Sequence, residues 1–262
     1  MAILAHKFVK KQSRMKILVC ISNVPDTTSK INFAEGDTKF DSNGVQFVIN
    51  PNDEFGLTRA MWFKEKQAAT VHVATVGLAS SESTIRKALA IGADEAIRVD
   101  MEPTNGLAVA TQLAKIIKDG AYDLVIAGRE SIDYNGGMVP GIIAAQLNYN
   151  FVNTCIGLEI EGEKVTATRE IDGGKETLST ELPLIIGGQK GLVEESDLRI
   201  PNMRGIMMAR QKKLNVVPVQ EMTNGSEDLK FEKPAPKGAV KLVDANNLSE
   251  LIDLLHNEAK AI

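Results

Sequence analysis

Short apolar runs alternate with amphipathic segments along residues 16–147. The apolar runs are rich in β-branched residues and predict strands buried on both faces, whereas the segments between them predict helices. Strands are expected at Lys16–Ser22, Thr70–Val76, Ala96–Val99 and Leu124–Ala127. Helices are expected from Asn50 to Lys66, Ser80 to Ile91, Asn105 to Gly120 and Met138 to Leu147. This alternation predicts a doubly wound α/β fold, with a mostly parallel sheet and helices on both faces.

After Asn150 the pattern changes to short strands, several of which alternate polar and apolar residues. They are expected at Cys155–Ile160, Val165–Ile171, Thr177–Glu181 and Leu184–Ile186, extending or capping the sheet in antiparallel fashion. Asp172-Gly173-Gly174 predicts a tight hairpin turn, because adjacent glycines supply positive φ values. A smaller hairpin is expected around Gly36. Residues 191–204 predict a long surface loop, and Gly205–Lys213 a short helix.

Three regions of the chain differ in composition. Residues 1–14 carry four basic groups and no acidic one, and we expect them to form a disordered extension. Residues 15–219 are predicted to form a nucleotide-binding α/β domain. Residues 220–262 combine a stiff, proline-containing linker with an amphipathic helix, Leu248–Lys260, that needs a surface to cover its apolar stripe. That surface is either the chain's own body or, as we favour, a partner subunit.

Composition and charge narrow the class of protein. The 262 residues are 44% hydrophobic and 24% charged, as in an ordinary globular protein with an ample core. A net charge of −4 implies no basic surface for nucleic acid. No apolar run approaches the roughly 20 residues that cross a bilayer, so we expect a protein that is not membrane-embedded. Cys20 and Cys155 lie far apart without a CxxC motif, which excludes a disulfide framework and favours a reducing, cytoplasmic compartment.

Catalytic side chains are scarce. His6, His72 and His256 lie near no candidate nucleophile and lack the spacing of metal ligands. No Walker-type loop occurs, and no GxGxxG motif follows a strand. We therefore expect no catalytic residue and no metal site, so that any reaction chemistry comes from a cofactor or a partner.

The loop Gly128–Gly141 is the strongest candidate for a ligand site. It follows the strand Leu124–Ala127 and leads into a helix, at the sheet edge where open α/β folds bind nucleotides. Its glycines let backbone amides approach a phosphate, and the helix N-terminus favours an anion. We expect Asp133 to orient amides or a hydroxyl, and the Asn50–Asp53 helix start to close the other side of the cleft. The alternative is a glycine-rich turn needed only for passage from strand to helix.

The second hairpin carries an unusual charge load around its turn. Arg169, Glu170, Asp172, Lys175 and Glu176 crowd together there. From the residues alone, the favoured interpretation is a solvated hairpin tip.

Several motifs resemble the beta subunit family of electron transfer flavoprotein over about residues 15–219. The most specific is this hairpin, Ala167-Thr-Arg-Glu-Ile-Asp-Gly-Gly-Lys-Glu-Thr-Leu178 with Pro183-Leu-Ile-Ile186, although Gly187 stands where Thr, Ala, Cys or Ser is usual. The supporting motifs are Pro25-Asp-Thr27, Asn50-Pro51, Arg86-Lys-Ala-Leu-Ala-Ile-Gly-Ala-Asp94, Gly128-Arg-Glu-Ser-Ile-Asp133 and Gly205-Ile-Met-Met-Ala-Arg210.

The resemblance implies two nucleotides. A partner alpha subunit would hold most of a functional FAD, and this chain would bury an AMP in its own crevice as a structural ligand. The implied AMP crevice comprises Cys20, Asn50, Pro51, Asn52, Asp53, Val76, Gly128, Arg129, Asp133, Asn135, Gly136, Gly137, Met138 and Val139. Gly137-Met-Val-Pro140 replaces the polar Asn-Gln-Thr-Gly common in the family. Backbone amide contacts with a phosphate survive this change, whereas a side-chain hydroxyl contact does not.

The resemblance also implies partners. Glu170 takes the position that faces the partner's FAD, and the loop 192–200 corresponds to the loop that docks acyl-CoA dehydrogenases. The C-terminal arm would embrace the alpha subunit. The implied function is an electron carrier without catalytic side chains of its own, passing electrons from acyl-CoA dehydrogenases to a membrane quinone oxidoreductase. Two alternatives stay open: a bifurcating electron transfer flavoprotein with a second FAD in the crevice, and a stand-alone adenine-nucleotide-binding protein.

Overall fold

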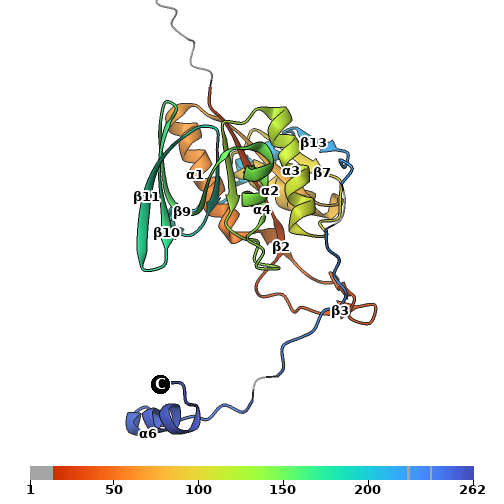
Figure 1. Ribbon diagram of the computed structural model, residues 1–262. Coiled ribbons are helices and arrows are strands. Elements are labelled where there is room, and N and C mark those ends of the chain that lie inside the picture. Colours follow the sequence, from red (N-terminus) through yellow and green to blue (C-terminus); the bar gives the residue numbers. More distant parts are fainter. Residues whose placement is uncertain (1–13, 223–224, 237) are drawn as a thin grey trace, which may run out of the picture.

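The computed structural model describes residues 14–222, 225–236 and 238–262. A nine-stranded sheet forms the centre of the molecule, in the order β11-β10-β9-β12-β8-β1-β6-β7-β13 (Figure 1). These strands are β1 (Lys16–Cys20), β6 (Thr70–Val76), β7 (Glu95–Val99), β8 (Leu124–Gly128), β9 (Asn150–Glu161), β10 (Lys164–Ile171), β11 (Gly174–Glu181), β12 (Leu184–Gly188) and β13 (Leu214–Val217). Two small sheets pair β2 (Asn23–Pro25) with β5 (Phe47–Ile49), and β3 (Phe33–Ala34) with β4 (Lys39–Phe40).

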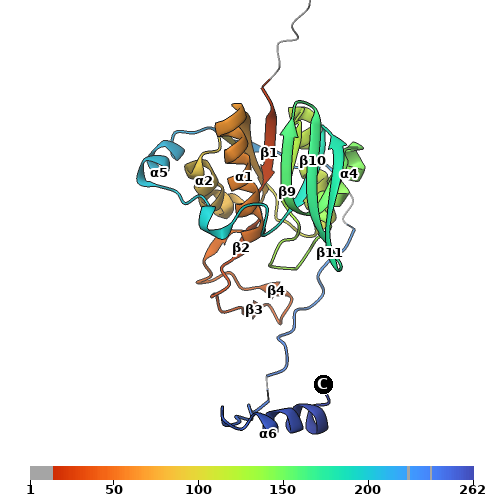
Figure 2. The ribbon, with the colours of Figure 1, turned by 90° about the vertical axis from the view of Figure 1, so that its left-hand side faces the viewer.

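The predicted fold class is confirmed, because neighbouring strands from β12 to β13 are all parallel. The hairpin strands β10 and β11 are antiparallel, as expected. Figure 2 shows them beside β9 at one end of the sheet.

The antiparallel prediction is wrong for β12, which lies parallel between β8 and β9. All five residues of β12 are buried, as a central strand requires, but a run this short does not reveal its neighbours. β9 also begins at Asn150, earlier than expected. Its first part is parallel to β12 and its second part antiparallel to β10, and Thr154, at a φ of 49°, lies where the partner changes.

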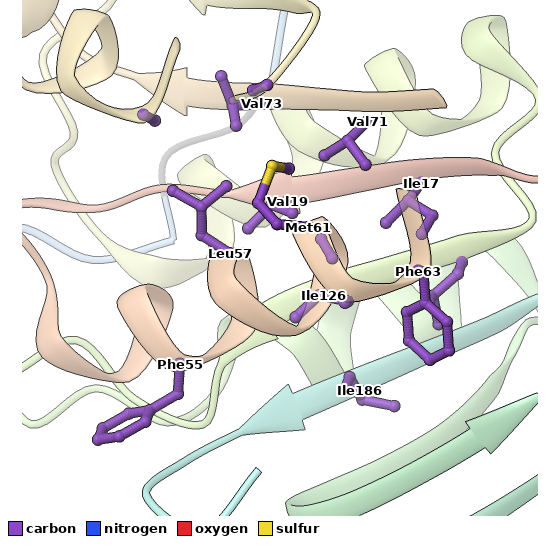
Figure 3. Packing of buried hydrophobic residues seen from close by; sticks show 14 of the residues in the cluster. Ile17, Val19, Phe55, Leu57, Met61, Phe63, Val71, Val73, Ile126 and Ile186 are labelled. Carbon is purple, nitrogen blue, oxygen red and sulfur yellow. The ribbon is translucent and has the colours of Figure 1, made fainter. Parts of the chain in front are cut away.

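Two helices cover each face of the sheet. On one face lie α1 (Pro51–Gln67) and α2 (Glu82–Ile91), which follows a short 3-10 helix, Ala79–Ser81. On the other lie α3 (Gly106–Gly120) and α4 (Val139–Leu147). Strand alternation sorts the core accordingly: Ile17 and Val19 pack with α1, whereas Leu18 and Cys20 pack with α3 and α4. Figure 3 shows Leu57 and Met61 of α1 lying against the sheet near Val19.

The last helix and strand of the body differ from prediction. The expected helix Gly205–Lys213 is α5 (Met203–Ala209), which starts earlier because the Asn202 side chain caps it by accepting the Gly205 amide at 2.8 Å. β13 was not predicted, since it has only four residues and pairs at the sheet edge with β7. The loop 191–204 contains a 3-10 helix, Glu195–Asp197, and is not wholly a surface segment, because Leu192 and Val193 are buried.

The last part of the C-terminal arm lies away from the body in both views (Figures 1 and 2). It contains α6 (Leu248–Asp253), which continues as a π-helical turn, Leu254–Glu258, so the expected helix is present but ends earlier. Within the described residues the linker is attached to the β3–β4 hairpin, where the rings of Phe231 and Phe33 stack at 5.2 Å. The Phe231 amide also donates to the Asp37 carbonyl at 2.7 Å. Apart from Arg14, the expected N-terminal extension lies outside the described residues.

Candidate nucleotide crevice and flavin-facing hairpin

The predicted crevice lies at the carboxyl edge of the parallel strands. Cys20 ends β1 and Val76 ends β6, and both side chains are buried in the cluster beneath α3 and α4. Burial, with a smaller contribution from the Asp53 carboxylate, raises the pKa of the Cys20 thiol far above its ordinary value. The thiol is therefore neutral and serves as an apolar wall rather than a nucleophile.

The start of α1 holds the loop after β8 in place. Asn50 is fully buried; its amide donates to the Glu130 carbonyl at 2.9 Å, and its oxygen accepts the Ile132 amide at 3.3 Å. Asn52 donates to the same carbonyl at 3.2 Å. The two segments thus meet as predicted, but these side-chain groups bond within the chain and shape the crevice loop. Pro51 begins α1 beside them.

Asp53 joins the ends of two strands. Its buried carboxylate accepts the Ser22 amide at 2.7 Å, just after β1, and the Gly128 amide at 2.8 Å, at the end of β8. Burial raises the pKa of Asp53 to about 7, although these bonds and one from Asn50 act in the opposite direction. The carboxyl group is therefore partly protonated near neutral pH.

Glycine is required at position 128. A Cβ there would overlap Oδ1 of Asp53 and lie 2.8 Å from Cβ of Asn52 and 2.9 Å from Nδ2 of Asn50. A Cβ at Gly136 would meet no atom within 4 Å, so that part of the loop is open. Because Gly128 has no side chain, its backbone can approach Asn50, Asn52 and Asp53 closely, and the start of α1 can bond to the loop.

The tip of the crevice loop is held by bonds within the loop. Ser131 and Gly136 close the loop with two backbone bonds, and Asp133 accepts the Ser131 hydroxyl and the Tyr134 amide. Asn135, at a φ of 49°, lies at the tip.

Among the described residues, the amides of Gly137, Met138 and Val139 have no acceptor. They immediately precede or begin α4, whose dipole adds positive potential, so this donor set suits a phosphate.

The turn of the charged hairpin, residues 171–175, is exposed, as a solvated tip would be, whereas Glu170 beside it is bonded toward the crevice loop. Arg169 pairs with Glu176 across the strands at 2.5 Å. The Glu170 carboxylate accepts the side-chain amide of Gln189 at 2.5 Å, and the Gln189 oxygen accepts the Arg129 guanidinium at 3.2 Å. Sequence reasoning missed Gln189, because one glutamine after a buried strand gives no signal of its partners.

The histidines that the structure describes lie away from the crevice. His72 contacts the Tyr122 hydroxyl at 2.8 Å, and His256 lies in the arm at 3.0 Å from the Ile262 carbonyl; His6 is outside the described residues. Across the described residues, no group of three or more His, Cys, Asp or Glu side chains is placed to hold a metal ion. Nor is any described helix long and apolar enough to cross a membrane. Surface cavities of about 440 and 590 Å³ are lined by other residues, beside α3 and near Asn150.

Comparisons with known proteins agree on one family. The profile of the electron transfer flavoprotein domain matches residues 37–222. The chain is 32% identical to the electron transfer flavoprotein subunit beta of Bacillus subtilis (strain 168), over 95% of this chain and 100% of that protein. It is 33% identical to the protein of the same name from Syntrophomonas wolfei subsp. wolfei, over 94% and 98%. It is also 33% identical to the mitochondrial electron transfer flavoprotein subunit beta of Oryza sativa subsp. indica, over 95% and 100%.

Proposed function

This chain belongs to the electron transfer flavoprotein beta subunit family, and from that membership we propose that it is half of a heterodimer that carries electrons from acyl-CoA dehydrogenases to a membrane quinone oxidoreductase. The observation that carries the proposal is the match to relatives named as beta subunits over at least 94% of the chain. The chain would act in the cytoplasm as a carrier without catalytic side chains of its own.

The crevice would hold AMP as a structural ligand. The amides of Gly137, Met138 and Val139 would bind the phosphate, and their lack of internal acceptors supports this assignment. Cys20 and Val76 would line the buried side of the crevice. The remaining predicted residues, Asn50, Pro51, Asn52, Asp53, Gly128, Arg129, Asp133, Asn135 and Gly136, would shape the loop that presents these amides.

The partner alpha subunit would hold most of the FAD, which supplies the redox chemistry when bound. This chain would contribute Glu170, whose carboxylate is exposed yet held by a hydrogen bond. An ionised carboxylate near a flavin disfavours the addition of electrons and attracts a basic partner residue. Glu170 would therefore tune electron transfer without reacting.

The loop 192–200 and α5 would contact acyl-CoA dehydrogenases. Leu192 and Val193 anchor the loop in the core, whereas Ile200 is 84% exposed. Met203 and Met207 of α5 are also exposed. Flexible methionine side chains suit a surface that accepts more than one partner, which supports this region as the docking site. The C-terminal arm would embrace the alpha subunit.

A second FAD in the crevice, as in a bifurcating protein, is the alternative. Two observations favour it: Met138, Val139 and Pro140 offer no hydroxyl to a nucleotide, and the surroundings of Gly136 are open. Counting FAD and AMP released from the purified heterodimer distinguishes the two, since one FAD with one AMP supports the carrier and two FAD support bifurcation.

Coexpression with an alpha subunit tests the proposed function. We expect a yellow complex with FAD that an acyl-CoA dehydrogenase and its acyl-CoA reduce. A colourless monomer that binds none of the alpha subunits tried would contradict the proposal. ATP turnover by the isolated chain would instead support the stand-alone nucleotide protein.

A further inference from the structure

Gln189 bridges the two candidate functional regions. It follows β12 and is only 7% exposed, with its backbone amide donating to the Cys155 carbonyl at 3.2 Å. Its side chain reaches Glu170 on the hairpin at 2.5 Å and Arg129 in the crevice loop at 3.2 Å. Arg129 is fixed in turn, because its guanidinium pairs with Glu130 at 2.8 Å and its amide donates to the Gly188 carbonyl at 2.8 Å.

The chemistry of the two neighbours sets the orientation of the Gln189 amide. A guanidinium donates and cannot accept, so the Gln189 oxygen must face Arg129. An ionised carboxylate accepts and cannot donate, so the amide nitrogen must face Glu170. Rotating the amide by half a turn would break both bonds, and a buried amide that loses its partners is destabilised. The side chain therefore has one stable orientation, and that orientation always offers a donor to Glu170.

The backbone of Glu170 is held separately. The Thr154 hydroxyl donates to the Glu170 carbonyl at 2.7 Å, at the place where β9 changes partners. With the main chain fixed there, the Gln189 amide decides where the carboxylate rests. An exposed glutamate without such a bond would populate several rotamers.

We propose that Gln189 is a positioning residue that holds the Glu170 carboxylate in one place for the partner's flavin and connects it to Arg129 of the crevice loop. The inference rests on the proposed function for the role of Glu170. It goes beyond that function by naming the residue that sets the position of this carboxylate, namely Gln189, which directly follows β12.

The first test uses the full chain alone and needs no flavin. In a ¹⁵N-labelled sample, the side-chain amide resonance of Gln189 is identified by its loss in Gln189→Met. We expect Glu170→Ala to shift this resonance and to speed exchange of its protons with water, while the side-chain amide of Gln67, at the far end of α1, stays unchanged. A Gln189 resonance that ignores Glu170→Ala would overturn the inference.

The second test uses the heterodimer and measures the flavin midpoint potential. Glu170→Gln should raise the potential by removing a negative charge, and Gln189→Met should shift it in the same direction by a smaller amount, because the charge stays but is no longer held near the flavin. The double variant should add little to Glu170→Gln, because both changes act through one carboxylate. Gln67→Met, matched in chemistry but remote, should leave the potential unchanged.

Folding is checked by thermal unfolding of each variant. If Gln189→Met fails to fold, Gln189→Leu replaces it, since it also removes the donor to Glu170 and adds no charge near the flavin. A potential that moves with Glu170→Gln but not with either Gln189 variant overturns the positioning role alone. Failure to form any flavin complex overturns the proposed function instead, and the resonance test then still decides whether Gln189 holds Glu170.

Discussion

At the scale of the residue, Gly128 gives the sharpest test of the crevice. Alanine there would force its Cβ into Asp53 and against Asn52 and Asn50, which are buried or packed at the helix start. We expect Gly128→Ala to lower the free energy of unfolding by about 2–3 kcal/mol, as overpacking at a rigid site does. The matched variant Gly136→Ala, with open space around its Cβ, should change stability by less than about 0.5 kcal/mol. Equal losses in urea unfolding of the two variants would contradict this account.

The pKa of Asp53 predicts how stability depends on pH. Burial raises that pKa to about 7, compared with about 3.9 in an unfolded chain. Between these values the folded state binds the proton more tightly, so the free energy of unfolding falls as the pH rises from about 4 to about 7, by at most about 4 kcal/mol. Above about pH 7 both states are ionised and the contribution stays constant.

Urea unfolding of the wild type and Asp53→Asn at about pH 5 and about pH 7.5 measures this effect. The asparagine does not titrate, but its NH₂ group meets a backbone donor, so the variant should be less stable at both values. The difference in the free energy of unfolding between the wild type and Asp53→Asn should be smaller at the higher pH. An advantage that stays constant, or grows with pH, would show that Asp53 has no raised pKa.

The meeting of the loop after β8 with the start of α1 was predictable from the sequence, whereas the bonds between them were not. Two local signals are visible in the sequence: a loop that follows a buried strand, and a helix start with the residues Asn-Pro-Asn-Asp. In an α/β fold both lie at the carboxyl ends of the parallel strands. Which of them faces a ligand depends on partners distant in sequence. Asp53 bonds to Gly128 across 75 residues, and no local pattern encodes that pairing.

At the scale of the element, the attachment of the linker to the β3–β4 hairpin can be tested directly. The stack of Phe231 on Phe33 should contribute about 1 kcal/mol, so Phe231→Ala should raise the detached population about five-fold. Trypsin cleavage after Lys230 should accelerate by a similar factor, because proteolysis follows the open population when reclosing is fast.

Leu229→Ala is the matched control for this experiment. Leu229 is 83% exposed in the same linker, so its removal should leave the cleavage rate unchanged. Cleavage after Lys241, beyond the attachment, should be insensitive to both substitutions. Equal rates for Phe231→Ala and the wild type would mean that the stack does not hold the linker.

Secondary structure was predicted well where apolar runs were long and flanked by clear helix signals. The limits of β6 agree with the prediction, and α3 begins after the Asn105 cap, whose side chain accepts the Ala108 amide at 2.8 Å. Strand order was harder. β12 inserts between β8 and β9, and its five buried residues would suit any central position in the sheet. The local sequence shows that a strand is buried, but which strands pair with it depends on the whole fold.

At the scale of the whole molecule, the crevice loop and the charged hairpin share one edge of the sheet. β8 ends at Gly128, β12 ends at Gly188, and Gln189, which follows β12, bonds to Glu170 near the end of β10. The opposite edge carries the ends of α1 and α3, where Lys16 donates to the Gly120 carbonyl at 2.7 Å. The candidate ligand site and the charged hairpin therefore lie on one side of the body, and the ends of α1 and α3 lie on the other.

The Phe33–Phe231 stack also fixes where on the body the free part of the C-terminal arm begins. Residues 234–247 act as a tether, which at about 3.3 Å per residue reaches at most about 46 Å. In the proposed heterodimer, α6 would sample the partner's surface at an effective concentration set by tether length, in the millimolar range for short linkers. Two individually weak contacts would then hold the partner with the strength of their combination, and the position of one aromatic pair would decide which part of the partner the second contact can reach.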